Sequence, residues 1–537
     1  MRKRASVVLA VLIVLASVAP AVVAADRPAA VDGQDVAPQR ADPDGDAIGW
    51  EDGYWHDESI DVDQSDGLSD EELDAYVARA MARVEHLRQT EFESDVPVEV
   101  LSREEFQERR NRNSTSNASY DAWNDQVWEA LFVIGEEQGA NSELQSASGQ
   151  TTAGFYAPGD DRIRIITDSP DSPTIDNATL VHELTHALQD QTGDLGEQIS
   201  STETQDAGLA TDGVVEGEAN YIETRYTQRC GVEWQCVATP SSGSSGTQEP
   251  PNLGILLTLL QPYSDGPVYI DWLRQQGGWS AVVEAFQNPP ESTEQIIHLT
   301  DEQPVPIEYE DRARNGWQTF PRQGESGSDT VGEASMYVMF WYQARTAGAR
   351  TINPRSVVQT TSPLDMYNYD AEPSAGWGND RVFPYHKGTG EDAQHGYVWV
   401  TEWDTEQDAA QFHNAYRAIL DAHDAESQGS NTYVIPSGEY ADAFRIDRDG
   451  TRVTIVNAPT TDELSEIRPA GAAAAGGSSD AGDSDGDSAG TTAAAGGEGE
   501  SDGGSSSGLE APGFGPLTAV LALIAAIAMA AVARRLD

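Results

Sequence analysis

Lysine is almost absent from this chain of 537 residues, and cysteine is equally rare. Lys3 and Lys387 are the two lysines, and 32 basic residues stand against 90 acidic ones, which gives a formal net charge of −58. Such a charge repels the phosphates of nucleic acids and the anionic faces of membranes. Nucleic acid is therefore not expected as a partner.

The acidic, lysine-poor composition resembles that of halophile proteins. In concentrated salt their carboxylates keep a hydrated shell, and the salt screens the repulsion between them. The resemblance implies that most of the charge serves solvation.

The two ends of the chain predict export and anchoring. Residues 1–25 have the order of a secretory signal peptide, with a basic start, an apolar run and small residues before Asp26. A Gly/Ser/Ala/Asp-rich linker over 469–510 leads to residues 511–537, which hold a Pro-Gly-Phe tripeptide, an apolar run that can cross a bilayer and a basic end. This last segment resembles the PGF-CTERM sorting signals of haloarchaeal surface proteins. The resemblance implies a transmembrane anchor, an archaeosortase-type processing enzyme as a partner and a place on the outer face of the cell membrane.

Two further features fit an exported chain. Cys230 and Cys236 lie in CGVEWQC, and an oxidising compartment favours a local disulfide between them. A metal site is the weaker interpretation, because it would need more ligands than this loop offers. Asn113 and Asn117 match the N-glycosylation pattern in a polar loop. Asn177 matches it too, but its position favours a helix cap, a role that Asp176 could also fill.

The sequence NATLVHELTHALQDQ contains an H-E-x-x-H motif. On a helix, His182 and His186 project from one face about one turn apart, which suits two ligands of one tetrahedral ion. Glu183 is then placed to act as general base on a water that zinc activates. Because the motif also occurs by chance, a third ligand is needed to support a zinc site.

A second helix, expected over 207–230, offers that ligand. We expect it to be Glu216, since Gly213 and Gly217 on the same face would let two helices approach closely. Glu218 is the main rival for this role. Asn220 lies one turn beyond Glu216 and could hydrogen-bond a ligand histidine from the outside.

These motifs resemble those of the gluzincin metallopeptidases, in which H-E-x-x-H is followed by a glutamate on a later helix, often as E-x-x-x-D. Here the matching span, 216–220, has an amide in place of the acid, which weakens the expected outer contact. The stretches GFYAP, HELTHALQDQ, VVEGEANYIETRY, NPPESTEQIIH, GWGNDRVFPY and WVTEWDTEQDAAQF resemble a group of exported, mostly uncharacterised metallopeptidases of bacteria and archaea. The resemblance covers about residues 154–412 and implies an α+β fold with a zincin-like core and Zn²⁺ as cofactor.

The domain organisation follows from these motifs and from the local patterns. A capped amphipathic helix is expected from Ser69, a hairpin over 154–167, and short strands between 432 and 456. In zincins an extended peptide pairs with the strand beside the zinc helix, so the hairpin is placed to bind substrate. The expected order is a signal peptide over 1–25, an acidic flexible arm over 26–68, a zincin-like catalytic domain over 69–300, a C-terminal α+β region over 301–468, the linker over 469–510 and the sorting segment over 511–537.

A peptidase also needs a donor for the oxyanion of its intermediate. His298 and Tyr269 are the candidates, and for each an ordinary structural role is the competing interpretation. The function expected is a cell-surface, zinc-dependent metallopeptidase that acts on a peptide or protein substrate. The alternatives are a non-catalytic surface binding or envelope protein with a structural zinc site, and a surface adhesin without metal.

Overall fold

The computed structural model describes residues 41–113, 117–149, 153–239 and 251–470. The chain divides into two units, 1–42 and 43–537, and the described residues lie almost wholly in the second. The expected signal peptide and sorting segment, and nearly all of the linker, lie outside the described residues. Within the described ranges, no helix is long and apolar enough to cross a membrane.

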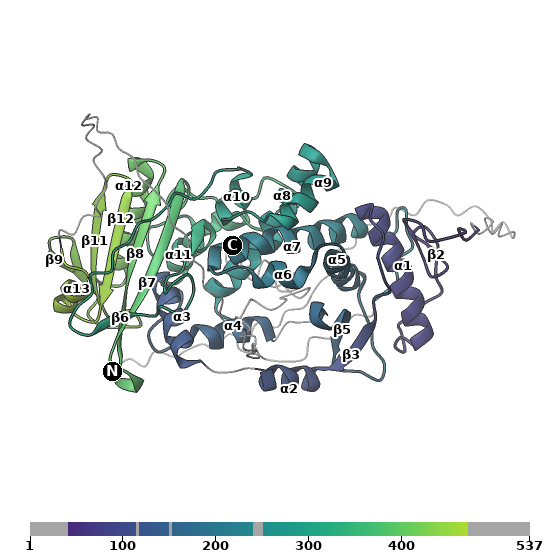
Figure 1. Ribbon diagram of the computed structural model, residues 1–537, viewed down its shortest axis with the longest axis horizontal. Coiled ribbons are helices and arrows are strands. Elements are labelled where there is room, and N and C mark those ends of the chain that lie inside the picture. Colours follow the sequence, from purple (N-terminus) through teal and green to yellow (C-terminus); the bar gives the residue numbers. More distant parts are fainter. Residues whose placement is uncertain (1–40, 114–116, 150–152, 240–250, 471–537) are drawn as a thin grey trace, which may run out of the picture. The chain divides into compact units, whose positions relative to one another are not determined.

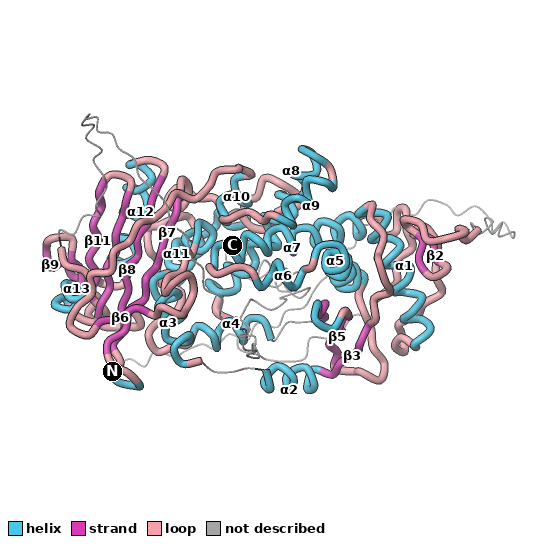
Figure 2. Tube along the Cα trace, in the orientation of Figure 1, coloured by secondary structure: helices cyan, strands magenta, loops and turns pink. Residues whose placement is uncertain are grey.

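Runs of helices and runs of strands follow one another along the described chain, so the protein is α+β, as predicted (Figure 2). The helices are α1 (Asp70–Arg88), α2 (Arg103–Asn113), α3 (Ala118–Ala130), α4 (Ala140–Gly149), α5 (Asn177–Gly193), α6 (Leu195–Ser200), α7 (Gln205–Thr227), α8 (Leu253–Gly277), α9 (Trp279–Gln287), α10 (Thr293–His298), α11 (Gly332–Thr346), α12 (Glu406–Ala422) and α13 (Thr461–Ile467). The strands are β1 (Trp50–Glu51), β2 (Tyr54–Trp55), β3 (Val98–Ser102), β4 (Gly154–Ala157), β5 (Arg162–Thr167), β6 (Trp317–Thr319), β7 (Trp377–Lys387), β8 (Gln394–Trp403), β9 (Glu426–Gly429), β10 (Thr432–Val434), β11 (Ala443–Asp449) and β12 (Arg452–Ala458).

A small sheet of three strands, in the order β3-β5-β4, lies against α5. The predicted hairpin is present, since β4 pairs antiparallel with β5 through Tyr156 opposite Ile163. Strand β3 pairs parallel with β5, a partner that the local sequence pattern does not reveal. Strand β4 therefore forms one edge of this sheet, next to the helix with the H-E-x-x-H motif.

A second sheet has seven strands in the order β6-β7-β8-β12-β11-β10-β9, and Figure 1 shows β7, β8, β12 and β11 side by side. Alternate residues of β8 enter different cores, as the period of two in a strand requires. Trp399 packs in one core with Phe412 of α12, whereas Val398 packs in another with Leu464 of α13. Helices α12 and α13 thus cover opposite faces of the sheet.

Contacts cross the predicted boundary between residues 300 and 301 in both directions. Helix α11 packs on α7, α8 and α10, and α3 packs on β7 and β8. A buried carboxylate supports this junction, because Asp329, just before α11, accepts a hydrogen bond from the backbone N–H of Gln205 on α7 at 2.8 Å. The two predicted domains are therefore packed as one body.

The described part of the predicted flexible arm, from residue 43, also differs from the expectation. Trp55, Ile60 and Leu68 are buried, and the Gln64 side chain exchanges hydrogen bonds with the backbone of Ile175 at 2.9 and 2.6 Å. Residues 43–68 are thus docked against the segment that leads into α5. The few apolar residues of this acidic segment are enough to hold it against the rest of the protein.

Helices α7 and α8 approach each other closely where both carry glycine. A Cβ on Gly217 would lie 2.6 Å from the carbonyl carbon of Gly266, and a Cβ on Gly266 would lie 2.5 Å from the carbonyl oxygen of Gly213. The glycines predicted to bring a carboxylate to the histidines therefore let α7 pack closely against α8.

Candidate metal centre

The H-E-x-x-H motif lies on α5, whose local sequence explains its position. Asp176 caps the helix by accepting a hydrogen bond from the Thr179 N–H at 2.9 Å, and buried leucines and alanines follow at helical spacing. His182 and His186 are 0% and 2% exposed, with ring centroids 4.8 Å apart. The predicted pair of histidines therefore shares one buried face.

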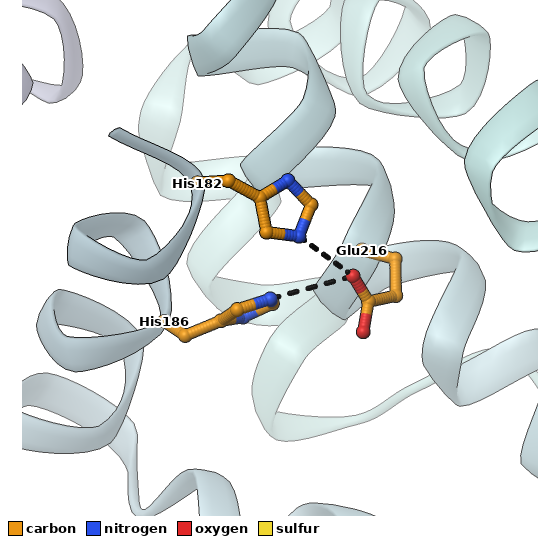
Figure 3. Close-up of side chains that lie close together, drawn as sticks. All are labelled: His182, His186 and Glu216. Atoms are coloured by element: carbon orange, nitrogen blue, oxygen red, sulfur yellow. Dashed lines mark hydrogen bonds and ion pairs between the residues drawn. The ribbon is translucent and has the colours of Figure 1, made fainter. Parts of the chain in front are cut away.

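Glu216 on α7 reaches both histidines (Figure 3). Its Oε2 lies 3.1 Å from His182 Nε2 and 3.3 Å from His186 Nε2. One atom from each of the three side chains falls within a span of 4.8 Å, so the set could hold a metal ion. The rival Glu218 is engaged elsewhere, in an ion pair with Arg88, so the structure brings together the three residues that the sequence favoured.

The charges at this centre are strongly coupled. Burial alone would lower the pKa of His182, but hydrogen bonds with Glu216 and Glu223 raise it well above its ordinary value. Burial would raise the pKa of Glu216, but the charge of His186 and the bond with His182 hold it at about 2. The carboxylate is therefore ionised in the folded protein and available as an anionic ligand.

Glu183 points at β4 from the same helix as the histidines. Its Oε2 accepts a hydrogen bond from the Tyr156 N–H at 2.8 Å, while its Oε1 is buried without a hydrogen-bond partner among the described residues. Burial raises the pKa of this carboxyl group. One oxygen is thus fixed by the sheet edge, and the other is left for a molecule or ion bound here.

The outward nitrogens of both histidines have partners that the motif did not single out. His182 Nδ1 lies 3.3 Å from Glu223 Oε2, and His186 Nδ1 lies 2.8 Å from Gln189 Oε1. Gln189 in turn donates to Glu218 Oε2 at 3.1 Å. Such contacts set the ring orientation and leave both Nε2 atoms directed at Glu216. The contact between His186 and Gln189 could have been predicted from their i to i+3 spacing on one helix. The contact between His182 and Glu223 depends on how α5 and α7 cross.

Asn220 does not make the contact expected of it. Its side chain donates to the carbonyl oxygen of Tyr263 at 3.3 Å, because the helix turns it toward α8, and Glu223, one turn further on, takes the place beside His182. Tyr263 itself was missed by the sequence analysis. Its ring stacks on that of His182 with centroids 6.3 Å apart, and burial followed by the charge of Glu216 raises its hydroxyl pKa well above the ordinary value.

The structure places the two oxyanion candidates in other settings. His298 Nε2 lies 3.0 Å from both carboxylate oxygens of Glu333, and this hydrogen bond raises the His298 pKa to about 9. Tyr269 stacks on Trp272 in a hydrophobic core, and burial raises its pKa to about 12. Neither has a described contact with the three candidate ligands, so the competing structural interpretation fits both better.

The remaining candidates from the sequence lie away from the centre. Cys230 and Cys236 form the predicted disulfide. Asn117 is exposed and caps α3 by accepting a hydrogen bond from the Ser119 N–H at 3.2 Å. Asn113 ends α2, and its side chain lies outside the described part.

Comparison with known families and proteins adds one match. Residues 318–468 match a family model described as a domain of unknown function, DUF8575. The match spans the seven-stranded sheet with α11, α12 and α13, and leaves out α5 and α7. No curated protein matches the chain, and no solved structure does.

Proposed function

We propose that this protein is a zinc-dependent metallopeptidase. The observation that carries the proposal is the meeting of His182, His186 and Glu216 within 4.8 Å, with Glu183 on the same helix. Two imidazole nitrogens and one carboxylate oxygen, with a fourth position left open, are a donor set typical of catalytic zinc. The export and anchoring expected from residues 1–25 and 511–537 would place the activity at the cell surface.

Unpartnered buried atoms support the fit of a metal ion. His186 Nε2 lies at ion-pair distance from Glu216 but has no hydrogen-bond partner among the described residues. Glu183 Oε1 likewise has no hydrogen-bond partner there. Buried polar atoms without partners are costly, so two of them on one turn of α5 support an additional ligand at this centre. A bound zinc ion would supply Lewis-acid activation of water and of a peptide carbonyl.

The protein's own groups would then divide the remaining work. Glu183 accepts the proton of the attacking water at Oε1, because its Oε2 is held by the Tyr156 N–H. Its raised pKa brings the carboxylate closer to the working pH of a base. Tyr263, which is hydrogen-bonded to Glu216 and keeps its proton, holds the ligand carboxylate in place.

Strand β4 is the element best placed to receive an extended peptide. It forms the edge of the β3-β5-β4 sheet, and its Tyr156 N–H already points at Glu183. A peptide paired with a sheet edge binds through its backbone, with alternate side chains on opposite sides. Substrate would thus lie beside the general base, in the manner of a zincin-like core.

One observation favours a second candidate, a non-catalytic protein with a structural zinc site. His182, Glu183 and His186 are 0%, 0% and 2% exposed, and a structural site is normally closed to solvent. The two functions share their metal ligands and differ in the task of Glu183.

The test compares the full chain, zinc-loaded, with Glu183→Gln in a peptide-library cleavage assay. The matched control is Glu197→Gln, the same change at an exposed residue of α6. Loss of a general base typically costs about 100- to 10,000-fold, so Glu183→Gln should lose cleavage by at least about 100-fold with its zinc retained, and the control should not. Zinc-loaded wild type that cuts nothing would instead support the structural site.

A further inference from the structure

A second group of carboxylates, two buried and one exposed, lies where the loop after α3 meets the loop between β10 and β11. The two loops are joined by hydrogen bonds from the Tyr440 hydroxyl to the Phe132 carbonyl at 2.8 Å and from the Glu136 N–H to the Glu439 carbonyl at 3.0 Å. One oxygen each of Glu129, Glu136 and Asp442 falls within a span of 4.8 Å. Three acidic groups thus share a space of about the size of one hydrated ion.

Burial disfavours the charged form of two of these carboxylates. Glu129 and Asp442 are each 6% exposed, and burial, followed by the charges of Asp442 and Glu136, raises the Glu129 pKa well above its ordinary value. Burial and the charge of Glu136 likewise raise the Asp442 pKa to about 8. Buried carboxylates of this kind take up protons or a cation.

Two buried amides supply an independent observation that points to a cation. Gln126 donates its amide N–H to Glu129 at 2.5 Å, and Asn457 donates to Asp442 at 2.8 Å, so both amides lie at the cluster. Gln126 and Asn457 are 6% and 0% exposed, yet Gln126 Oε1 and Asn457 Oδ1 have no hydrogen-bond partner among the described residues. Two further buried oxygen acceptors thus lie beside Glu129 and Asp442, without a donor for them in the described part of the chain.

We propose that Glu129, Glu136 and Asp442, with the amide oxygens of Gln126 and Asn457, form a calcium site. The donors are all oxygen, which hard cations prefer, and three carboxylates favour a divalent ion. The three carboxylate oxygens lie within 4.8 Å of one another, which is close enough for one calcium ion to contact all three at about 2.4 Å. Magnesium fits less well, since it demands a rigid octahedron and keeps several waters.

The site would act as a clamp between two parts of the fold. Asp442 and Asn457 belong to the span that matches the family model, 318–468, whereas Gln126, Glu129 and Glu136 belong to α3 and the loop after it. A calcium ion would cross-link the seven-stranded sheet to α3. This proposal does not rest on the zinc centre, because the two sites share no residue.

The test titrates Ca²⁺ into the zinc-loaded, calcium-stripped full chain by calorimetry, with thermal unfolding in parallel, in about 1 M KCl to screen weak surface binding. We expect one calcium per chain and a higher unfolding temperature. Glu129→Gln and Asp442→Asn should weaken binding by at least tenfold. Because either change could impair folding, the exposed Glu136→Gln gives a third variant with the same expected loss.

The control is Glu137→Gln, which removes the neighbouring charge but leaves the ligand set intact, and it should bind calcium like wild type. The proposal is overturned if folded wild type binds no calcium, if Glu137→Gln weakens binding as much as Glu136→Gln does, or if Mg²⁺ binds as tightly as Ca²⁺.

Discussion

A buried carboxylate among the helices around α5 and one in the seven-stranded sheet differ in how many hydrogen-bond partners they have. In the sheet region, Asp380 is 0% exposed and takes bonds from two backbone N–H groups and two tryptophan indoles. In the helical region, Glu183 is equally buried but has one partnered oxygen and one without a described partner. A buried carboxylate whose oxygens all accept hydrogen bonds supports the fold. One with an oxygen that accepts none from the described residues can still interact with a bound ion or molecule.

The largest effect is expected from removing the carboxylate that the two histidines share. Loss of an outer contact to a metal ligand typically costs 10- to 100-fold in affinity. Because Glu216→Ala removes a proposed ligand itself, it should weaken zinc binding by more than about 100-fold. Glu223→Ala, which removes the contact with His182 Nδ1 and leaves the three candidate ligands in place, should cost about tenfold. Competition titrations with a zinc chelator measure both, and equal affinities in the two variants would remove Glu216 from the ligand set.

In the sheet region, Asp380→Asn should affect folding and leave the zinc centre intact. An amide cannot accept all four hydrogen bonds and brings an N–H against other donors, so we expect a loss of about 3 kcal/mol in the free energy of unfolding. Denaturant unfolding measures it. Asp421→Asn, on the exposed side of α12, is the matched control and should change little. An Asp380→Asn variant with unchanged stability and lost zinc would contradict the view that Asp380 supports only the fold.

A smaller loss is expected where α7 and α8 touch. In Gly217→Ala the new methyl group would meet the backbone of Gly266 at 2.6 Å, so the helices must separate at a cost of about 1–3 kcal/mol. Because α7 carries Glu216, zinc affinity should fall as well. Gly196→Ala on α6, where the nearest atom is at 3.6 Å, should be neutral in both assays. Unchanged zinc affinity in Gly217→Ala would show that α8 does not position the ligand.

The smallest effect concerns His298, a histidine that the structure assigns to the fold. Its folded pKa of about 9 lies above the ordinary 6.5, so its contribution to stability is present below pH 6.5 and is lost as pH rises through about 9. The side chain is 30% exposed, so we expect at most about 1 kcal/mol. Denaturant unfolding between pH 6 and 10 should show a shallower decline for His298→Gln than for wild type. Identical slopes would mean that the pair with Glu333 adds nothing.

The parts of the site that sequence predicted are those set by local geometry. The spacing of His182 and His186 depends on a single helix, and so does the cap at Asp176. Glu216 could be chosen over Glu218 because helical rotation separates their directions. These are short-range relations with few alternatives.

The parts that sequence missed depend on how distant elements meet. Tyr263 comes from α8 and Glu223 from the second half of α7, and both reach His182 only through helix packing. Strand β3 likewise joins β5 across more than 50 residues, without a local signal. The packing across the predicted boundary at 300/301 had no local signal either, since α3 and α11 each contact elements on the other side of it.

The most direct test of the zinc centre is X-ray absorption at the zinc edge, with metal content, on the folded full chain. The account predicts one zinc per chain with two imidazole nitrogens and oxygen ligands, and loss of that zinc in Glu216→Ala. Folded protein without zinc, or zinc held by sulfur or by more than two imidazoles, would contradict it.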